Sequence, residues 1–232
     1  MIPAMDRRFV ILSAPLMLLL SAAAPAPANR DASASVAVQV ELLTDLGPIV
    51  IAVDTARAPI TSGNFLAYVD GKRFDGTVFY RSMQLGLPAQ QPNGLVQGGT
   101  QNDPRRVLKP IAHEPTTQTG ILHKAGTVSM ARYAPGTATG DFTIMLSDLA
   151  WLDANPADPA SEAGAGFAAF GQVVAGMDTV RRIFDAPRSP TAGAGVMKGQ
   201  MLDPPVRIVS ARRVATAQPR PQVLPPGRPR PD

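Results

Sequence analysis

FDGTVFYRSMQLGLPAQQPNGLVQGGT, residues 74–100, is the most informative segment of the chain. Asp75-Gly76 predicts a tight turn, because glycine adopts the positive φ that such turns need. The β-branched and aromatic residues that follow predict a short strand ending at Arg81. After a loop, a second apolar strand carries Gln97 and ends in Gly98-Gly99, a pair typical of a sharp turn or a close backbone approach. Taken alone, the segment also fits a hairpin whose Arg and Gln lie in solvent.

Four motifs, in order along the chain, are similar to the signature of the cyclophilin-type peptidyl-prolyl cis-trans isomerases. They are Phe79-Tyr-Arg81 with Leu95-Val-Gln-Gly-Gly99, Gly126-Thr-Val-Ser-Met-Ala131, Gly140-Asp-Phe-Thr-Ile144, and Ala169-Phe-Gly-Gln-Val173 with Gly176-Met-Asp178. Trp151-Leu152-Asp153 lies at the expected distance after Phe142. Each motif is weak by itself, but their common order makes the resemblance specific, and it extends over about residues 36–214.

The resemblance implies an all-β fold: a closed barrel of eight antiparallel strands, with a packed interior, two capping helices and a substrate groove on the outside. It implies rotation about an X–Pro peptide bond, a reaction in which no bond is made or broken. Neither a nucleophile nor a metal nor a cofactor is needed, so we expect none. The catalytic residues implied are Arg81, which donates a hydrogen bond to the proline nitrogen of the twisted amide, and Gln97, which bonds the substrate backbone.

The resemblance also implies which residues contact the proline-containing polypeptide. They are Leu95, Ala131, Arg132, Phe142, Thr143, Trp151 and Leu152. In this family the loop that follows the Met-Ala pair, here Met130-Ala131, holds the peptide in an extended form.

Several departures from the family pattern fall around the pocket that holds the proline ring. The loop between the two strands is about twice the usual length, with the extra residues at 84–92. Gly94-Leu95 and Thr143 stand where the family has a Phe-Met pair and a Phe, and no histidine follows Trp151-Leu152. Tyr80 replaces the histidine that precedes the arginine. We expect an apolar residue at this loop to fill part of the pocket: Met83, Leu85 or Leu87.

Two functions are consistent with these residues. The first is a prolyl isomerase that assists the folding of exported proteins, with Arg81 and Gln97 as its support. The second is a cyclophilin-like peptide-binding or scaffold module with weak or no catalysis, which the altered pocket favours. A hydrolase requires a nucleophile paired with a histidine, and neither His113 nor His123 lies in a nucleophile motif.

Composition excludes several other classes. The 232 residues carry a formal charge of +4, but the arginines are scattered and aromatics are only 5%, so we expect no nucleic-acid partner. The absence of cysteine excludes disulfides, thiol catalysis and Cys-ligated metal centres. With two histidines, a His-rich metal site is not expected either. We expect a monomer.

The chain divides into four expected regions. Residues 1–28 have the pattern of a secretory signal peptide, with arginines at 7 and 8, an apolar segment and small residues before a cleavage site. A leader at 29–35, the isomerase domain at 36–214 and a Pro/Arg-rich disordered tail at 215–232 follow. An uncleaved anchor is the alternative, but the apolar run is short for a span of ~20 residues. We therefore expect cleavage, no membrane insertion afterwards and a periplasmic location.

Periodicity within the domain predicts about eight short strands and two helices. Alternating apolar residues predict a hairpin at 36–53. One helix is expected from Ala58 to about Asp70, capped by Thr61 or Ser62, and another from Met177. The segment 101–124 has three prolines and predicts a long loop. We expect its polar residues to lie in solvent: His113, Glu114 and His123.

Overall fold

The structure, a computed structural model, describes residues 38–214. The expected signal peptide, the leader and the C-terminal tail lie outside this range. The strands are β1 Val38–Thr44, β2 Gly47–Val53, β3 Val78–Gln84, β4 Gly94–Gly99, β5 Thr127–Met130, β6 Asp141–Met145, β7 Ala169–Ala175 and β8 Met201–Val214. The helices are α1 Pro59–Asp70, α2 Thr116–Thr119 and α3 Met177–Asp185, with 3₁₀ turns η1 Pro88–Gln90, η2 Ala150–Leu152 and η3 Gly195–Met197. None of the helices within 38–214 is long and apolar enough to span a bilayer.

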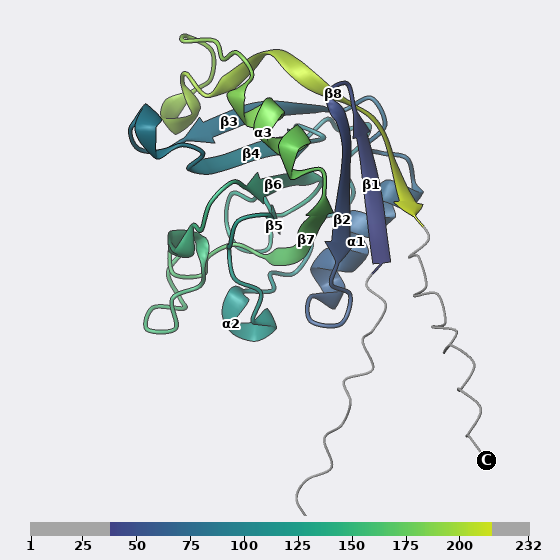
Figure 1. The fold of residues 1–232 in the computed structure, drawn as a ribbon. Helices are drawn as coiled ribbons and strands as arrows, with labels where there is room; N and C mark the ends of the chain where they lie inside the picture. Colours follow the sequence, from purple (N-terminus) through teal and green to yellow (C-terminus); the bar gives the residue numbers. More distant parts are fainter. Residues whose placement is uncertain (1–37, 215–232) are drawn as a thin grey trace, which may run out of the picture. The chain divides into compact units, whose positions relative to one another are not determined.

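The strands close into one antiparallel barrel, in the order β1-β2-β7-β5-β6-β4-β3-β8, and β8 pairs with β1. Figure 1 shows α3 and α1 packed against this barrel. The predicted closed eight-stranded fold with two covering helices is therefore confirmed. The structure adds α2, a single helical turn inside the segment that was expected to be a loop.

Aromatic side chains fill the barrel interior, so the barrel has a packed core. Phe142 of β6 belongs to this core and is fully buried. Its ring packs edge-on against Phe65, Phe74 and Phe79, with centroids 5.5, 5.4 and 5.7 Å away. Because successive side chains of a strand alternate between its two faces, the residue after Phe142, Thr143, faces the outside of the barrel. This alternation separates core residues from residues available to a ligand.

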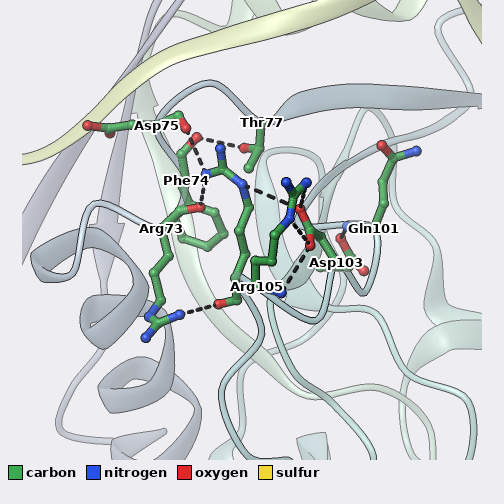
Figure 2. Close-up of polar contacts among 9 residues, drawn as sticks. Arg73, Phe74, Asp75, Thr77, Gln101, Asp103 and Arg105 are labelled. Carbon is green, nitrogen blue, oxygen red and sulfur yellow. Dashed lines mark hydrogen bonds and ion pairs between the residues drawn. The ribbon is translucent and has the colours of Figure 1, made fainter.

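Two arginines, Arg73 and Arg106, flank the segment 74–100, and each donates a side-chain hydrogen bond to the backbone carbonyl of the other (Figure 2). The Arg106 guanidinium donates to the carbonyls of Arg73 and Asp75, at 2.9 and 2.8 Å, and Arg73 donates back to the carbonyl of Arg106 at 2.8 Å. Bonds of this kind satisfy loop carbonyls that no strand partner reaches. The loop after β4 is thereby fastened to the turn before β3.

The expected cap of α1 is wrong. Thr61 and Ser62 lie inside the helix, which begins at Pro59 after Ala58. The cap comes from Glu114 instead: its carboxylate accepts the backbone N–H groups of Ile60 and Thr61, at 3.1 and 2.7 Å. The negative charge also suits the positive end of the helix dipole. Glu114 is therefore buried, with 1% of its surface exposed, and not solvated as its loop position suggested.

We expect Glu114→Ala to lower the free energy of unfolding by about 2–3 kcal/mol, because the cap is lost and buried donors are left without a partner. Urea denaturation of both proteins measures the change. The exposed Glu162 supplies the matched control, and Glu162→Ala should shift the midpoint little. Equal midpoints for Glu114→Ala and Glu162→Ala would contradict the capping role.

Candidate active site

A β-bulge in β3 directs two successive side chains to the outer face of the barrel. The register of β3 against both β4 and β8 shifts between Phe79 and Arg81, which leaves Tyr80 as the extra residue. Phe79 lies in the core, whereas Tyr80 and Arg81 both line a cavity on the outer face. Without the bulge, alternation would place only one of the pair there.

The Arg81 guanidinium is held at each of its three nitrogens. Nε donates to Oε1 of Gln200 at 2.8 Å, and Nη1 donates to Oε1 of Gln97 at 2.9 Å. Nη2 contacts Sδ of Met83 at 3.4 Å. A guanidinium has five N–H donors, so two N–H groups are free of partners among residues 38–214. Burial lowers the pKa of Arg81, but arginine remains charged at neutral pH.

Gln97 lies directly across the ladder from Arg81, because the two residues are register partners of β3 and β4. Its Oε1 accepts from Arg81, and its Nε2 donates to Oη of Tyr80 at 2.7 Å. Burial raises the pKa of Tyr80, so this hydroxyl stays protonated and can donate a hydrogen bond of its own. The site thus presents a row of donors from Tyr80, Gln97 and Arg81.

The cavity beside this row has a volume of about 440 Å³. One part of its lining is apolar: Met83, Leu95, Met145, Leu152, Phe167, Met197 and Met201. Another part is polar: Gln101, Asn102, Thr137, Thr139, Asp141 and Thr143. Burial raises the pKa of Asp141, although three backbone N–H groups oppose the shift. The arrangement suits a ligand that has both an apolar ring and a peptide backbone.

The cavity brings together nearly all the residues that the resemblance implicated. Its lining includes Arg81, Gln97, Leu95, Ala131, Arg132, Thr143, Trp151 and Leu152. Phe142 is the exception, because it points into the barrel core and does not line the cavity. Its expected contact with a substrate is therefore corrected.

The three candidates for filling the pocket lie in different places. Met83 lines the cavity and is 8% exposed. Leu85 packs against the cluster that contains Met83, Leu95 and Met145. Leu87 is 68% exposed and fills nothing. Most of the extra loop, including η1, therefore lies at the surface. The residue that narrows the pocket is Met83, which belongs to β3.

The residues that form the rest of the apolar wall carry no clear signal in the sequence. Met197 ends η3, and Met201 is the first residue of β8. In the preceding segment, Gly, Pro and Ala give no periodicity. Strand β8 begins at Met201, three residues before the prolines at 204 and 205. These prolines hide the start of the strand in the sequence, since proline argues against a paired strand. The two methionines at 197 and 201 are the one feature of this segment that could have indicated an apolar pocket.

His123 was expected in solvent, but it is fully buried. Its Nδ1 lies 2.6 Å from Oδ1 of Asp153, and its Nε2 lies 2.9 Å from Oγ of Ser129. This is the connectivity of a hydrolytic triad. However, none of the three residues lines the cavity, and Ser129 is fully buried. The trio therefore fastens the loop after η2 to β5. His113, half-buried, contacts the carbonyl oxygen of Ala165 at 2.9 Å.

Burial lowers the pKa of His123 below its usual value of 6.5, although Asp153 opposes the shift. The unfolded chain therefore binds a proton near pH 6.5 that the folded protein does not. We expect full stability above pH 6.5 and a loss below it, of at most ~1.4 kcal/mol per pH unit from this group. Urea midpoints between pH 5 and 8 test this. The loss should be smaller in His123→Gln and unchanged in His113→Gln; equal slopes in all three proteins would refute it.

Residues 38–214 contain no group of three or more His, Cys, Asp or Glu side chains that could hold a metal ion.

Comparison with known proteins identifies the family. The model of the cyclophilin-type peptidyl-prolyl cis-trans isomerase family matches residues 38–213. A peptidyl-prolyl cis-trans isomerase of Acinetobacter baylyi is 35% identical over 75% of this chain and 84% of its own. Peptidyl-prolyl cis-trans isomerase A of Dickeya dadantii is 33% identical over 62% of this chain and 70% of its own.

A solved structure agrees with the fold. The crystal structure of a Cryptosporidium parvum cyclophilin-type isomerase, determined in the presence of the dipeptide Ala-Pro, has a TM-score of 0.59 and 18% identity. The match covers 77% of this chain and 99% of that one. With four ordered motifs, a closed barrel and a family match over the whole described domain, the chain belongs to the cyclophilin-type peptidyl-prolyl cis-trans isomerases.

Proposed function

We propose that this protein catalyses cis–trans isomerisation of X–Pro bonds in exported proteins, and that Arg81 stabilises the twisted amide. The observation that carries the proposal is the immobilised guanidinium: Arg81 lines the cavity, is held at all three nitrogens, and keeps two N–H donors.

The chemistry needs little more than this donor. Resonance keeps the peptide bond planar and sets a rotation barrier of about 18–20 kcal/mol. When the bond twists, the proline nitrogen becomes pyramidal and gains a lone pair, which can accept a hydrogen bond from Arg81. The planar nitrogen is a poor acceptor, so the interaction favours the transition state over the ground state.

The other residues of the site position the peptide. The apolar wall of the cavity suits the proline ring, and the remaining N–H of Gln97 and the hydroxyl of Tyr80 can bond carbonyl groups of the substrate backbone. Thr143 leaves room where the family has a Phe. Methionines 83, 145, 197 and 201 restore apolar surface to the pocket. Because thioether side chains adapt to irregular shapes, the pocket is rebuilt, which favours catalysis over simple binding.

Export is supported by the sequence of residues 1–28, whose charged, apolar and small-residue segments have the order of a secretory signal. Cell fractionation of the full chain with a C-terminal epitope tests this part. A shortened protein in the periplasmic fraction is the expected result; a full-length protein in the cytoplasmic fraction would refute export.

Isomerase activity is tested by NMR exchange spectroscopy of a short X–Pro peptide with catalytic amounts of the chain that lacks residues 1–28. The wild type should accelerate cis–trans exchange, which is otherwise slow, in the range of tens to hundreds of seconds. Absence of acceleration, from a protein that is shown to be folded and to bind the peptide, would favour the peptide-binding module instead.

A further inference from the structure

We propose that Gln200 is a positioning residue for the isomerase reaction: it orients the Arg81 guanidinium without touching the substrate. The proposal rests on the proposed function for its effect on rate, but its effect on the Arg81 side chain can be measured separately.

The first support is the place of the contact on arginine. The 2.8 Å bond from Nε to Oε1 of Gln200 complements the bond from Nη1 to Gln97. Two bonds in different directions within the plane of a guanidinium fix that plane. The contact at Nη2, to the sulfur of Met83, is a weak one. Without Gln200, only Gln97 would provide a strong bond, and the guanidinium could rotate about it.

The second support is that Gln200 is itself held rigidly. Its side-chain Nε2 donates to the carbonyl of Val196 at 2.8 Å. Its backbone carbonyl accepts the N–H of Ser82, the residue after Arg81, at 2.9 Å. The Gln200 amide therefore has both polar ends engaged, with Oε1 directed to Arg81. A residue held on both sides in this way can transmit orientation to its neighbour.

The third support is that Gln200 does not line the cavity, although Met197 and Met201 on either side of it do. A substrate in the cavity would contact the methionines and Arg81 but not Gln200. Loss of the Gln200 side chain should therefore lower kcat and leave KM nearly unchanged.

The kinetic test compares Gln200→Leu with Gln118→Leu, in which an exposed glutamine of α2 is changed in the same way. We expect kcat to fall about tenfold in Gln200→Leu, the effect of losing one hydrogen bond to a charged group, with KM within a factor of about two. Gln118→Leu should match the wild type. A folded Gln200→Leu with wild-type kcat would overturn the proposal.

The spectroscopic test needs no catalysis. In ¹⁵N-edited spectra of the wild type, the Nε–H of Arg81, assigned with Arg81→Lys, should exchange with water more slowly than the Nε–H of the exposed Arg181. Gln200→Leu should abolish this protection and Gln118→Leu should keep it. Rapid exchange in the wild type would overturn the proposal even if Gln200→Leu failed to fold. An inactive wild type with a protected Arg81 Nε–H would instead contradict only the proposed function.

Discussion

Arg81→Ala is expected to lower kcat/KM for X–Pro isomerisation by roughly 10²- to 10³-fold, the effect of removing a donor that is oriented for the transition state. The two free N–H groups of Arg81 can donate a hydrogen bond to the nitrogen lone pair as it forms. Peptide binding should weaken much less, because the apolar wall remains. Exchange spectroscopy at several peptide concentrations separates the two effects.

Two variants control this experiment. Arg81→Lys keeps the charge but loses the planar fork that Gln97 and Gln200 hold, so it should remain strongly impaired. Arg105→Ala removes an arginine whose side chain is 86% exposed and paired with Asp103 at the surface (Figure 2), and it should behave as the wild type. An Arg81→Ala protein that keeps wild-type activity would contradict the proposed role of Arg81.

Phe142→Ala is expected to lower the free energy of unfolding by about 3–5 kcal/mol, because the deletion leaves a cavity in a close-packed core. The ring is fully buried and touches three other phenylalanines, and each aromatic pair adds to the loss from burial alone. For a domain of this size, each kcal/mol shifts Tm by about 2–4 °C. Calorimetry should therefore show a decrease of roughly 10 °C.

The same residue separates a core role from a substrate role. Phe142→Leu keeps most of the buried volume and should lose much less stability than Phe142→Ala. Because Phe142 does not line the cavity, its kcat and KM at a temperature well below Tm should stay near those of the wild type. A folded Phe142→Leu with a greatly raised KM would show that Phe142 does contact the substrate.

The strands and helices were largely predictable from neighbouring residues, whereas the closed barrel was implied by the family resemblance. The signals involved are local: the alternation in β1 and β2, the turn at Asp75-Gly76 and the apolar period of α3. Each relates residues that lie only a few positions apart, so a short stretch of sequence contains it. The pairing of Arg81 with Gln97 was also within reach, since the two motifs flank a single loop. Placing Arg81 on the outer face, where Gln97 lies, still required the bulge at Tyr80, for which the sequence carries no local signal.

The environment of each polar group could not be predicted in the same way. Glu114 and His123 lie in a proline-containing loop that was expected to be solvated. Each is buried because its partner comes from elsewhere: the start of α1 for Glu114, and Asp153 for His123. A loop residue becomes buried only when another segment folds over it, and the residues next to it in sequence do not indicate whether this happens.

By itself, therefore, the sequence determined the strands, the helices and their order along the chain, because turns and alternation are set by adjacent residues. The closed barrel and the Arg–Gln pair were implied by the resemblance that its motifs carry. Only the tertiary structure decided how that pair is held and what surrounds it. Gln200 lies 119 residues from Arg81. The methionines of the apolar wall come from β3, β6, η3 and β8. Closing the barrel brings these segments together, and contacts across such separations depend on which surfaces are buried against each other.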